Sequence, residues 1–401
     1  LQNLAEMEEI QKQAKKNRGI LEISGCMESQ KAHLMYGLSG LFPCHLVIAA
    51  DEKSAKELYE DYRFYDKRVY YYPAKDLLFF QADIHGNLLI RQRMQVIRAL
   101  LEREDEITVV TSIDGCMDYL APLEKIEKQL IHFRNDSTLD MDKLTAALVH
   151  MGYERVGQVE MPGQFSIRGG IIDIYSLTEE NPWRIELWGD EIDSIRSFDK
   201  ESQRSIEEVD TLTIYPASEI ILNQPRIEHG LRNMEEDYEK LSQKFKKEKK
   251  YDQEARLRKE MDRVREELRE LHMLIGVEGY LPYFYENTEC ILDYFPEESM
   301  IYMDEPKHIR ERADAFYLEF SESMKSRLEG GYLLPKQANT VTDYESILYQ
   351  IEKHKMLCYS ILSAEINDFR VARTLFMDTK SIQSYNNSFE QLVKDLTKYQ
   401  S

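Results

Sequence analysis

A glycine and a lysine at a fixed spacing give the sequence its most informative chemical signal. The segment GCMESQKA, residues 25–32, follows a short apolar run and precedes a helical pattern. Set against the phosphate-loop pattern G-x-x-x-x-G-K-S/T, Gly25 and Lys31 match, whereas Gln30 replaces the second glycine and Ala32 replaces the hydroxyl residue. Glycine lets backbone N–H groups wrap closely round phosphate oxygens, and the hydroxyl binds Mg²⁺. We therefore expect a degenerate nucleotide site.

An acidic pair far downstream belongs to the same interpretation. Asp304 and Glu305 follow a predicted strand at residues 300–303, which resembles the acidic, Mg²⁺-orienting strand of phosphate-loop ATPases. The alternative is that Gly25 and Lys31 mark an ordinary surface turn, because one glycine and one lysine at this spacing are common. Both interpretations predict that this chain does not hydrolyse ATP.

Composition and the remaining motifs exclude several other classes of protein. The chain has 73 Asp and Glu against 52 Lys and Arg, a net charge of −21, which argues against a protein that mainly coats a phosphate backbone. The five cysteines are far apart and form no CxxC pair, and the histidines form no HExxH motif, so no metal site or cofactor is expected. No apolar run is long enough to span a bilayer, and the cysteine usage favours a reducing cytoplasm.

The elements around these residues predict an α/β protein of several parts. Up to residue 128, strand-like runs alternate with helical patterns, as in a parallel sheet covered by helices. Short strands and turns over residues 156–215 predict a small inserted α+β domain. Residues 231–274 lack Gly and Pro and carry two apolar stripes that are out of phase, which favours two antiparallel helices joined near residues 249–252.

These patterns divide the chain into four predicted domains. Residues 1–128 are domain 1a, a degenerate phosphate-loop fold, and residues 129–215 are the inserted domain 2. Residues 216–350, with the helical hairpin, are domain 1b and complete the first sheet across the insertion. Residues 351–401 are expected to be a linker and the start of a further α/β domain that the first fold does not need. Because the chain lacks an initial Met, we expect it to be part of a longer protein.

Strand alternation predicts a possible partner surface in domain 2. Successive residues of a strand point to opposite faces, so Ile185 and Leu187 face the core while Arg184 and Trp188 face away from it. The same alternation puts Arg168 on an outer face. Arg and Trp are enriched in interface hot spots, which favours a protein-binding face. The alternative is that Trp188 packs under a helix and the arginines are ordinary solvated side chains.

Two long motifs give domain 2 a family resemblance. Residues 163–175, GQFSIRGGIIDIY, and residues 183–199, WRIELWGDEIDSIRSFD, resemble the second domain of the bacterial transcription-repair coupling factor family, known as Mfd. That domain is shared with the excision-repair helicase UvrB. Shorter matches at residues 72–76, 109–112, 215–218 and 292–296 extend the resemblance, in order, over most of residues 20–350.

The resemblance implies an N-terminal, UvrB-like module without ATPase activity. UvrB has an intact phosphate loop and a long Tyr-rich hairpin after its third strand, whereas residues 69–76 here run almost directly into the next helix. The family implies that domain 2 recruits the UvrA repair subunit to stalled RNA polymerase, that Arg168, Arg184 and Trp188 contact UvrA, and that the module helps to autoinhibit the motor. ATP, Mg²⁺, RNA polymerase and double-stranded DNA would then bind to regions beyond this chain.

Two other functions remain open at this point. One is an ATP-dependent DNA helicase or a UvrB-type damage-loading protein, against which Gln30, Ala32 and the missing hairpin argue. The other is a structural scaffold with no defined partner. Nucleotide binding would favour the first, and failure to bind UvrA would favour the second.

Overall fold

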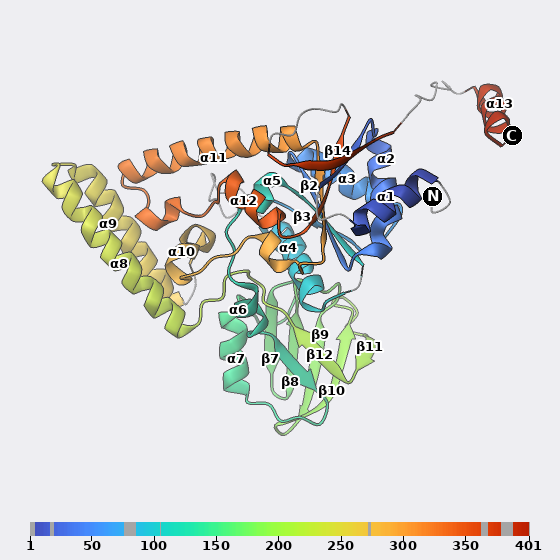
Figure 1. The fold of residues 1–401 in the computed structure, drawn as a ribbon. Helices are drawn as coiled ribbons and strands as arrows, with labels where there is room; N and C mark the ends of the chain where they lie inside the picture. The colour runs from blue at the N-terminus through green and yellow to red at the C-terminus, as the bar shows by residue number, and fades with distance from the viewer. Residues whose placement is uncertain are drawn as a thin grey trace.

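A seven-stranded, wholly parallel sheet forms the centre of the protein (Figure 1). The computed structural model describes residues 5–16, 20–75, 86–104, 106–271, 274–361, 368–377 and 388–400. The strand order is β15-β1-β14-β13-β2-β4-β3, and every neighbouring pair is parallel. The strands are β1 (Ile20–Ser24), β2 (Cys44–Ala49), β3 (Val69–Tyr72), β4 (Ile107–Ser112), β13 (Met300–Asp304), β14 (Lys355–Ser360) and β15 (Val371–Phe376).

Helices cover both faces of this sheet, so the central strands are buried on two sides. In β2, Leu46 and Ile48 join the core on one face, while Val47 and Ala49 join the core on the other. The Val47 face packs against α1 (Ala5–Lys16), α2 (Glu28–Leu38) and α3 (Glu52–Arg63). The Leu46 face packs against α4 (Gly86–Leu101), α5 (Ile113–Met117), α11 (Pro306–Glu329) and α12 (Tyr344–Ile351). This double cover explains the continuous apolar run of β2.

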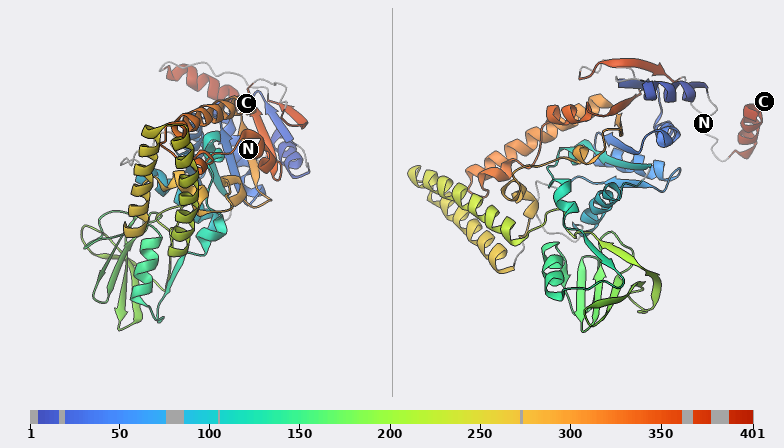
Figure 2. Two further views of the ribbon diagram at one scale, coloured as in Figure 1. Left: turned by 90° about the vertical axis from the view of Figure 1, so that its left-hand side faces the viewer. Right: turned by 60° about the horizontal axis from the view of Figure 1, so that its bottom comes forward.

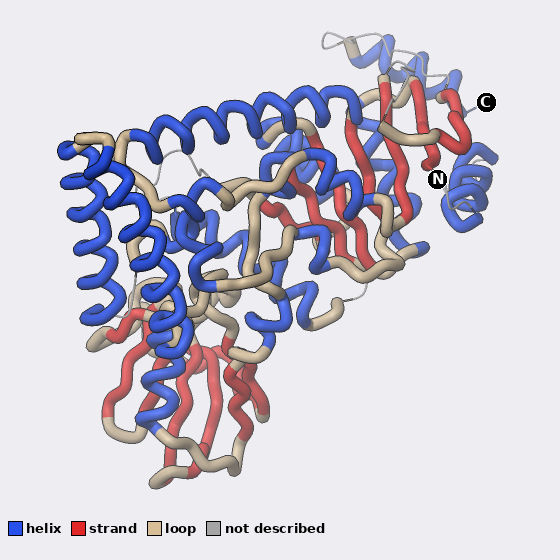
Figure 3. The backbone as a smooth tube through the Cα atoms, turned by 60° about the vertical axis from the view of Figure 1, so that its left-hand side comes forward, coloured by secondary structure: helices blue, strands red, loops and turns tan. Residues whose placement is uncertain are grey.

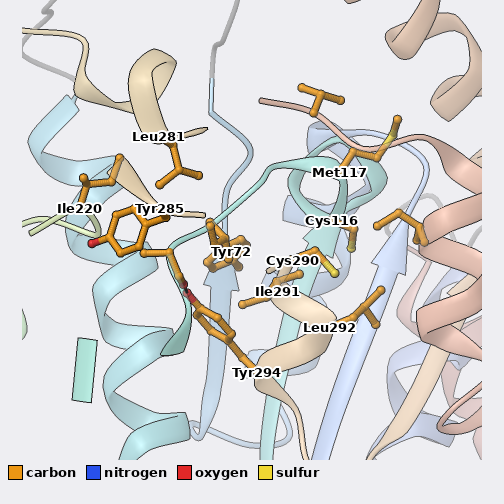
Figure 4. Packing of buried hydrophobic residues seen from close by; sticks show 14 of the residues in the cluster. Tyr72, Cys116, Met117, Ile220, Leu281, Tyr285, Cys290, Ile291, Leu292 and Tyr294 are labelled. Carbon is orange, nitrogen blue, oxygen red and sulfur yellow. Dashed lines mark hydrogen bonds between the residues drawn. The ribbon is translucent and has the colours of Figure 1, made fainter. Parts of the chain in front are cut away.

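Figure 4 shows how distant segments fill the core on the Leu46 face. Tyr72 at the end of β3 lies near Cys116 of α5 and the segment that carries Cys290, Ile291 and Tyr294. That segment contains the short helix η4 (Ile291–Tyr294), so residues from both sides of the insertion form one core. The remaining short helices are η1 (Ser39–Leu41), α6 (Leu123–Glu127), η3 (Val277–Tyr280), α10 (Leu281–Phe284) and η5 (Pro335–Ala338).

A second, largely antiparallel sheet forms a separate unit below the first (Figure 1). Its order is β11-β10-β9-β8-β7-β6, and α7 (Met141–His150) supplies Leu144 and Leu148 to its core. A two-stranded sheet of β5 (Ile131–Arg134) and β12 (Thr211–Ile214) completes the unit. The six strands are β6 (Glu154–Arg155), β7 (Gln164–Arg168), β8 (Ile171–Tyr175), β9 (Trp183–Trp188), β10 (Glu191–Phe198) and β11 (Ser205–Val209).

Two long antiparallel helices project from the parallel-sheet region, as the phase break predicts (Figures 2 and 3). They are α8 (Gln224–Lys247) and α9 (Tyr251–Glu266), and a π-helical turn, η2 (Glu267–Leu271), follows α9. Lys249 has φ 58° at the turn between them. The side chain of Asn223 caps α8 by accepting a hydrogen bond from the Arg226 backbone N–H, so the helix begins before residue 231.

The last fifty residues correct one expectation from the sequence. β14 lies between β1 and β13, and β15 extends the same sheet beyond β1. The prediction that the first fold does not need these residues is therefore wrong, although the completion of the sheet across the insertion by β13 is confirmed. Beyond β15, α13 (Phe389–Gln400) exposes Phe389, Val393 and Leu396. The overall α/β class is confirmed, and the four domain limits stay a prediction.

A buried ion network ties the second unit to the first. Arg93 of α4 has no exposed surface and donates to Glu219, which follows β12, at 2.5 Å, and to Asp118, which precedes α6, at 3.1 Å. Lys75 forms a further ion pair with Glu219. Burial alone would raise the pKa of Glu219, but the charges of Arg93 and Lys75 outweigh it and lower that pKa to about 2. Burial is the larger effect on Asp118 and raises its pKa to about 6.

Among the described residues, every helix is too short or too polar to cross a lipid bilayer. The segment in which a UvrB-type hairpin was expected to be missing includes residues 76–85, which lie outside the described residues.

Candidate functional site

The loop after β1 is enclosed by the chain's own backbone. Gly25 has φ 81°, and its N–H donates to the carbonyl of Ser360 at 2.9 Å. A Cβ atom at Gly25 would lie 2.7 Å from the carbonyl oxygen of Met377, just after β15, so a larger residue would clash with backbone there. The glycine is thus explained by the packing of β14 and β15 around this loop.

Lys31, near the start of α2, is paired with the acidic end of β13. Its Nζ atom lies 2.6 Å from Oδ1 of Asp304 and 3.6 Å from Oε1 of Glu305, and the Lys31 side chain is 2% exposed. Burial favours the neutral amine, but the charge and hydrogen bond of Asp304, with the charge of Glu305, outweigh it and raise the pKa of Lys31. The lysine is therefore charged and held by carboxylates.

Glu305 joins the ends of two neighbouring strands. It has φ 59°, its backbone N–H donates to Tyr359 at 2.9 Å, and its carboxylate accepts from the Ile361 N–H at 2.7 Å. A non-glycine residue in the left-handed region costs free energy, which these two bonds help to offset. The structure thus brings Gly25, Lys31, Asp304 and Glu305, distant in sequence, to one end of the parallel sheet.

The two substituted positions of the loop have structural roles of their own. The Gln30 side chain accepts a hydrogen bond from the Met27 backbone N–H at 3.1 Å, at the start of α2. Ala32 is 1% exposed and belongs to the core that α1, α2 and α3 form. The Met27 N–H at the start of α2 is thus already hydrogen-bonded within the chain. Ala32 has no hydroxyl group, and its side chain is not accessible to solvent. Within the described ranges, no group of three or more His, Cys, Asp or Glu side chains is arranged to hold a metal ion.

The outer face of the second sheet carries the other predicted residues. Arg184 pairs with Asp173 across β8 and β9, and Trp188 lies four residues further along β9, on the same side of the strand by alternation. The Trp188 side chain is strongly exposed, at 83%, so the alternative that it packs under a helix is wrong. Arg168 ends β7 with 47% of its side chain exposed.

Arg184 lies on the expected face but is largely covered. Only 12% of its side chain is exposed, and its guanidinium lies over the Phe198 ring at 4.3 Å. Its Nη2 also donates to Gln203 at 2.8 Å, and Gln203 belongs to the loop between β10 and β11. Arg168 and Trp188 are therefore the more accessible members of the predicted set.

Asp173 is the residue of this face that the sequence did not assign. It is 1% exposed and accepts hydrogen bonds from Arg168 at 2.8 Å and from Arg184 at 2.7 and 2.9 Å. A second carboxylate, Glu186, accepts from Arg196 at 2.5 Å. The signal in the sequence was the single acid in the run IIDIY, but a bulge at the preceding Gly169 and Gly170 would reverse the face that it takes, so the sequence left it unassigned.

Comparison with known proteins defines the class of the second unit. The family model for the UvrB interaction domain matches residues 131–220, which include both sheets of this unit and its outer face. The chain therefore contains an interaction domain of the UvrB type.

Longer proteins resemble the chain on both sides of this domain. The chain is 32% identical over 394 residues to the transcription-repair-coupling factor of Bacillus subtilis, an alignment that covers 94% of this chain and 33% of that protein. It is 27% identical over 334 residues to the transcription-repair-coupling factors of Staphylococcus epidermidis and Staphylococcus aureus, covering 83% of this chain and 28% of each. The chain spans about a third of the length of these curated relatives. Over nearly its whole length the chain is therefore similar to a part of the transcription-repair-coupling factors, and it carries a domain that the UvrB interaction model matches.

Proposed function

We propose that this chain is the recruitment module of a transcription-repair coupling factor and that it binds UvrA through the outer face of the second sheet. In the whole protein, the module would bring UvrA to stalled RNA polymerase and help to autoinhibit the motor. RNA polymerase and double-stranded DNA would bind to other regions of that protein.

One observation carries the proposal. In the unit that matches the UvrB interaction domain, Trp188 is 83% exposed and lies on the same face of the sheet as the half-exposed Arg168. Large aromatic and Arg side chains dominate the binding energy of protein interfaces, and burying an exposed indole supplies apolar area. The surrounding arginines are matched by Asp173 and Glu186, which favours a defined protein surface over a phosphate backbone.

We further propose that the loop at residues 25–32 is a degenerate nucleotide site without ATPase activity. Lys31, which would contact phosphate in an intact phosphate loop, is held by Asp304 at 2.6 Å. Ala32 lacks the Mg²⁺-binding hydroxyl and is buried. These contacts support a structural role for the loop, and that role requires neither ATP nor Mg²⁺.

Capture of UvrA tests the proposal directly. Wild-type chain immobilised on resin is expected to retain purified UvrA, whereas Arg168→Ala and Trp188→Ala, alone or combined, are expected to lose most of the capture without a large change in melting temperature. Adding Arg184→Ala to give the triple variant is expected to abolish capture and also to lower the melting temperature, because it removes the main partner of the buried Asp173. The matched control is Arg63→Ala with Phe64→Ala, a neighbouring exposed Arg and aromatic pair at the end of α3, far from this sheet in the chain. Failure of the wild type to capture UvrA, or unchanged capture by the triple variant, would contradict the proposal.

A further inference from the structure

One buried carboxylate holds both arginines of the outer face. Asp173 lies in the middle of β8, where its side chain is 1% exposed, and its Oδ2 accepts from Arg168 at 2.8 Å and from Arg184 at 2.9 Å. Its Oδ1 accepts from Nε of Arg184 at 2.7 Å. The carboxylate is thus shared between one covered and one accessible guanidinium.

The two arginines differ in what they still offer to a partner. Three hydrogen bonds engage Arg184, two to Asp173 and one to Gln203, and Phe198 covers its guanidinium plane. Arg168 makes one hydrogen bond within the described part of the chain, to Asp173, and a guanidinium carries five N–H donors. Arg168 can therefore keep its bond to Asp173 and still donate to an acceptor on another protein.

Holding such a side chain in advance strengthens binding. An arginine that a partner must immobilise loses side-chain entropy on association. The bond to Asp173 restricts Arg168 before the partner arrives, and Arg184 neutralises the carboxylate that provides this restriction. Neither Asp173 nor the greater part of Arg184 needs to touch the partner for this effect.

We propose that Asp173 is a positioning residue of the UvrA-binding face: together with Arg184 it fixes the Arg168 guanidinium for a carboxylate on the partner, beside Trp188. This inference rests on the proposed function. It assigns direct contact to Arg168 and Trp188, and it assigns an indirect role, through Asp173, to Arg184.

A double-mutant cycle measured by biolayer interferometry with purified UvrA tests the inference. Asp173→Asn keeps the size of the side chain and removes its charge. We expect it to weaken UvrA binding about tenfold, mainly through faster dissociation. In an Arg168→Ala background, Asp173→Asn is expected to have almost no further effect, because residues that act through one another are not additive.

A second variant covers the possibility that Asp173→Asn leaves Arg184 unpaired and unfolds the domain. Asp173→Asn with Arg184→Gln removes both charges of the buried pair, so the domain is expected to fold and still to bind UvrA weakly. In this variant, the NMR signals of the Arg168 guanidinium are expected to lose the dispersion that they have in the wild type. A merely structural role of Asp173 would leave the rate of UvrA dissociation from this folded variant at the wild-type value.

The outcomes separate the two proposals. If wild-type chain fails to bind UvrA, the proposed function fails. If the wild type binds and the double variant binds equally well, or if Asp173→Asn and Arg168→Ala are additive, the positioning role is overturned and the proposed function stands. Unfolding of both Asp173 variants would show that Asp173 holds the fold together and would also overturn the positioning role.

Discussion

The Nζ atom of Lys31 lies 2.6 Å from Oδ1 of Asp304, although 272 residues separate them in the chain. The pair joins the start of α2 to the end of β13, on the same edge of the parallel sheet as Gly25. A carboxylate of the protein thus neutralises the lysine that a phosphate loop would offer to a nucleotide. The contact converts a position associated with ligand binding into one that holds the fold.

Breaking this pair from one side is expected to be costly. Asp304→Asn leaves Lys31 buried without its closest anion, and removal of one partner of a buried ion pair costs about 3–5 kcal/mol. We expect the free energy of unfolding to fall by an amount near the lower end of this range, since the Glu305 carboxylate remains 3.6 Å from Nζ of Lys31. The double variant Lys31→Met with Asp304→Asn removes both charges and should be more stable than Asp304→Asn alone. Urea unfolding measures both, and a double variant as unstable as the single one would contradict the explanation.

Restoring the two lost residues of the loop is not expected to restore nucleotide binding. In Gln30→Gly with Ala32→Thr, Lys31 remains paired with Asp304, and the new hydroxyl lies at a position that is 1% exposed. Isothermal titration with MgATP should therefore give no binding heat for the wild type or for this variant. Gln30→Gly alone serves as the control for disturbance of α2. Saturable binding by the double variant would contradict the prediction.

The buried Glu219 predicts a dependence of stability on pH. Its pKa is about 2 in the folded chain, against an ordinary value of 4.5 for an exposed glutamate, so the unfolded state binds more protons between these values. The stabilisation by Glu219 is therefore fully present above pH 4.5 and is lost as the pH falls through 2. Glu219→Gln should lower the free energy of unfolding by about 3 kcal/mol at pH 7, and by less at pH 3.

Urea midpoints of wild type and Glu219→Gln at pH 7, 5, 4 and 3 measure this difference. The control is Glu124→Gln, which removes an exposed pair with Lys128 and should change the midpoint little. Asp118, whose pKa of about 6 lies above its usual value, acts in the opposite sense. Its contribution is present below pH 4 and is lost as the pH rises through 6. A difference between wild type and Glu219→Gln that grows toward pH 3 would be the contrary result.

The position of β14 makes a prediction about where the chain can be shortened. A chain ending at residue 350 lacks β14, which pairs with β1 on one side and β13 on the other. It should therefore fail to fold, because the two strands lose their shared neighbour and their buried cover. A chain ending at residue 377 keeps both β14 and β15 and is the matched control. Circular dichroism and thermal melting compare them, and cooperative melting of the shorter chain would refute the assignment.

Local patterns predicted most elements and part of the candidate site. Asp51, a residue type typical of a helix start, caps α3 by accepting from the Ser54 N–H at 2.8 Å. The phase break between apolar stripes predicted the turn between α8 and α9. Alternation along β9 predicted that Trp188 points away from the core. Each signal depends on residues a few positions apart, so the sequence carries it directly.

The order of the strands in the parallel sheet could not be predicted from such local patterns. Nothing local to residues 355–360 indicates that β14 belongs between β1 and β13, because strand pairing joins segments hundreds of residues apart. The ion pair of Lys31 was likewise not predictable from local patterns. The sequence grouped Lys31 with Asp304 only by analogy with phosphate-loop ATPases, whereas the order of the strands in the sheet brings the two residues into contact.

The sequence by itself determined the residue types of the outer face, the substitutions at Gln30 and Ala32, and the alternation that exposes Trp188. Only the tertiary structure decided that Asp173 holds Arg168 and Arg184 together, and that the loop carrying Gln203 covers most of Arg184. The physical reason is that a buried carboxylate is tolerable only with charged partners around it. Those partners come from neighbouring strands whose register the folded sheet fixes.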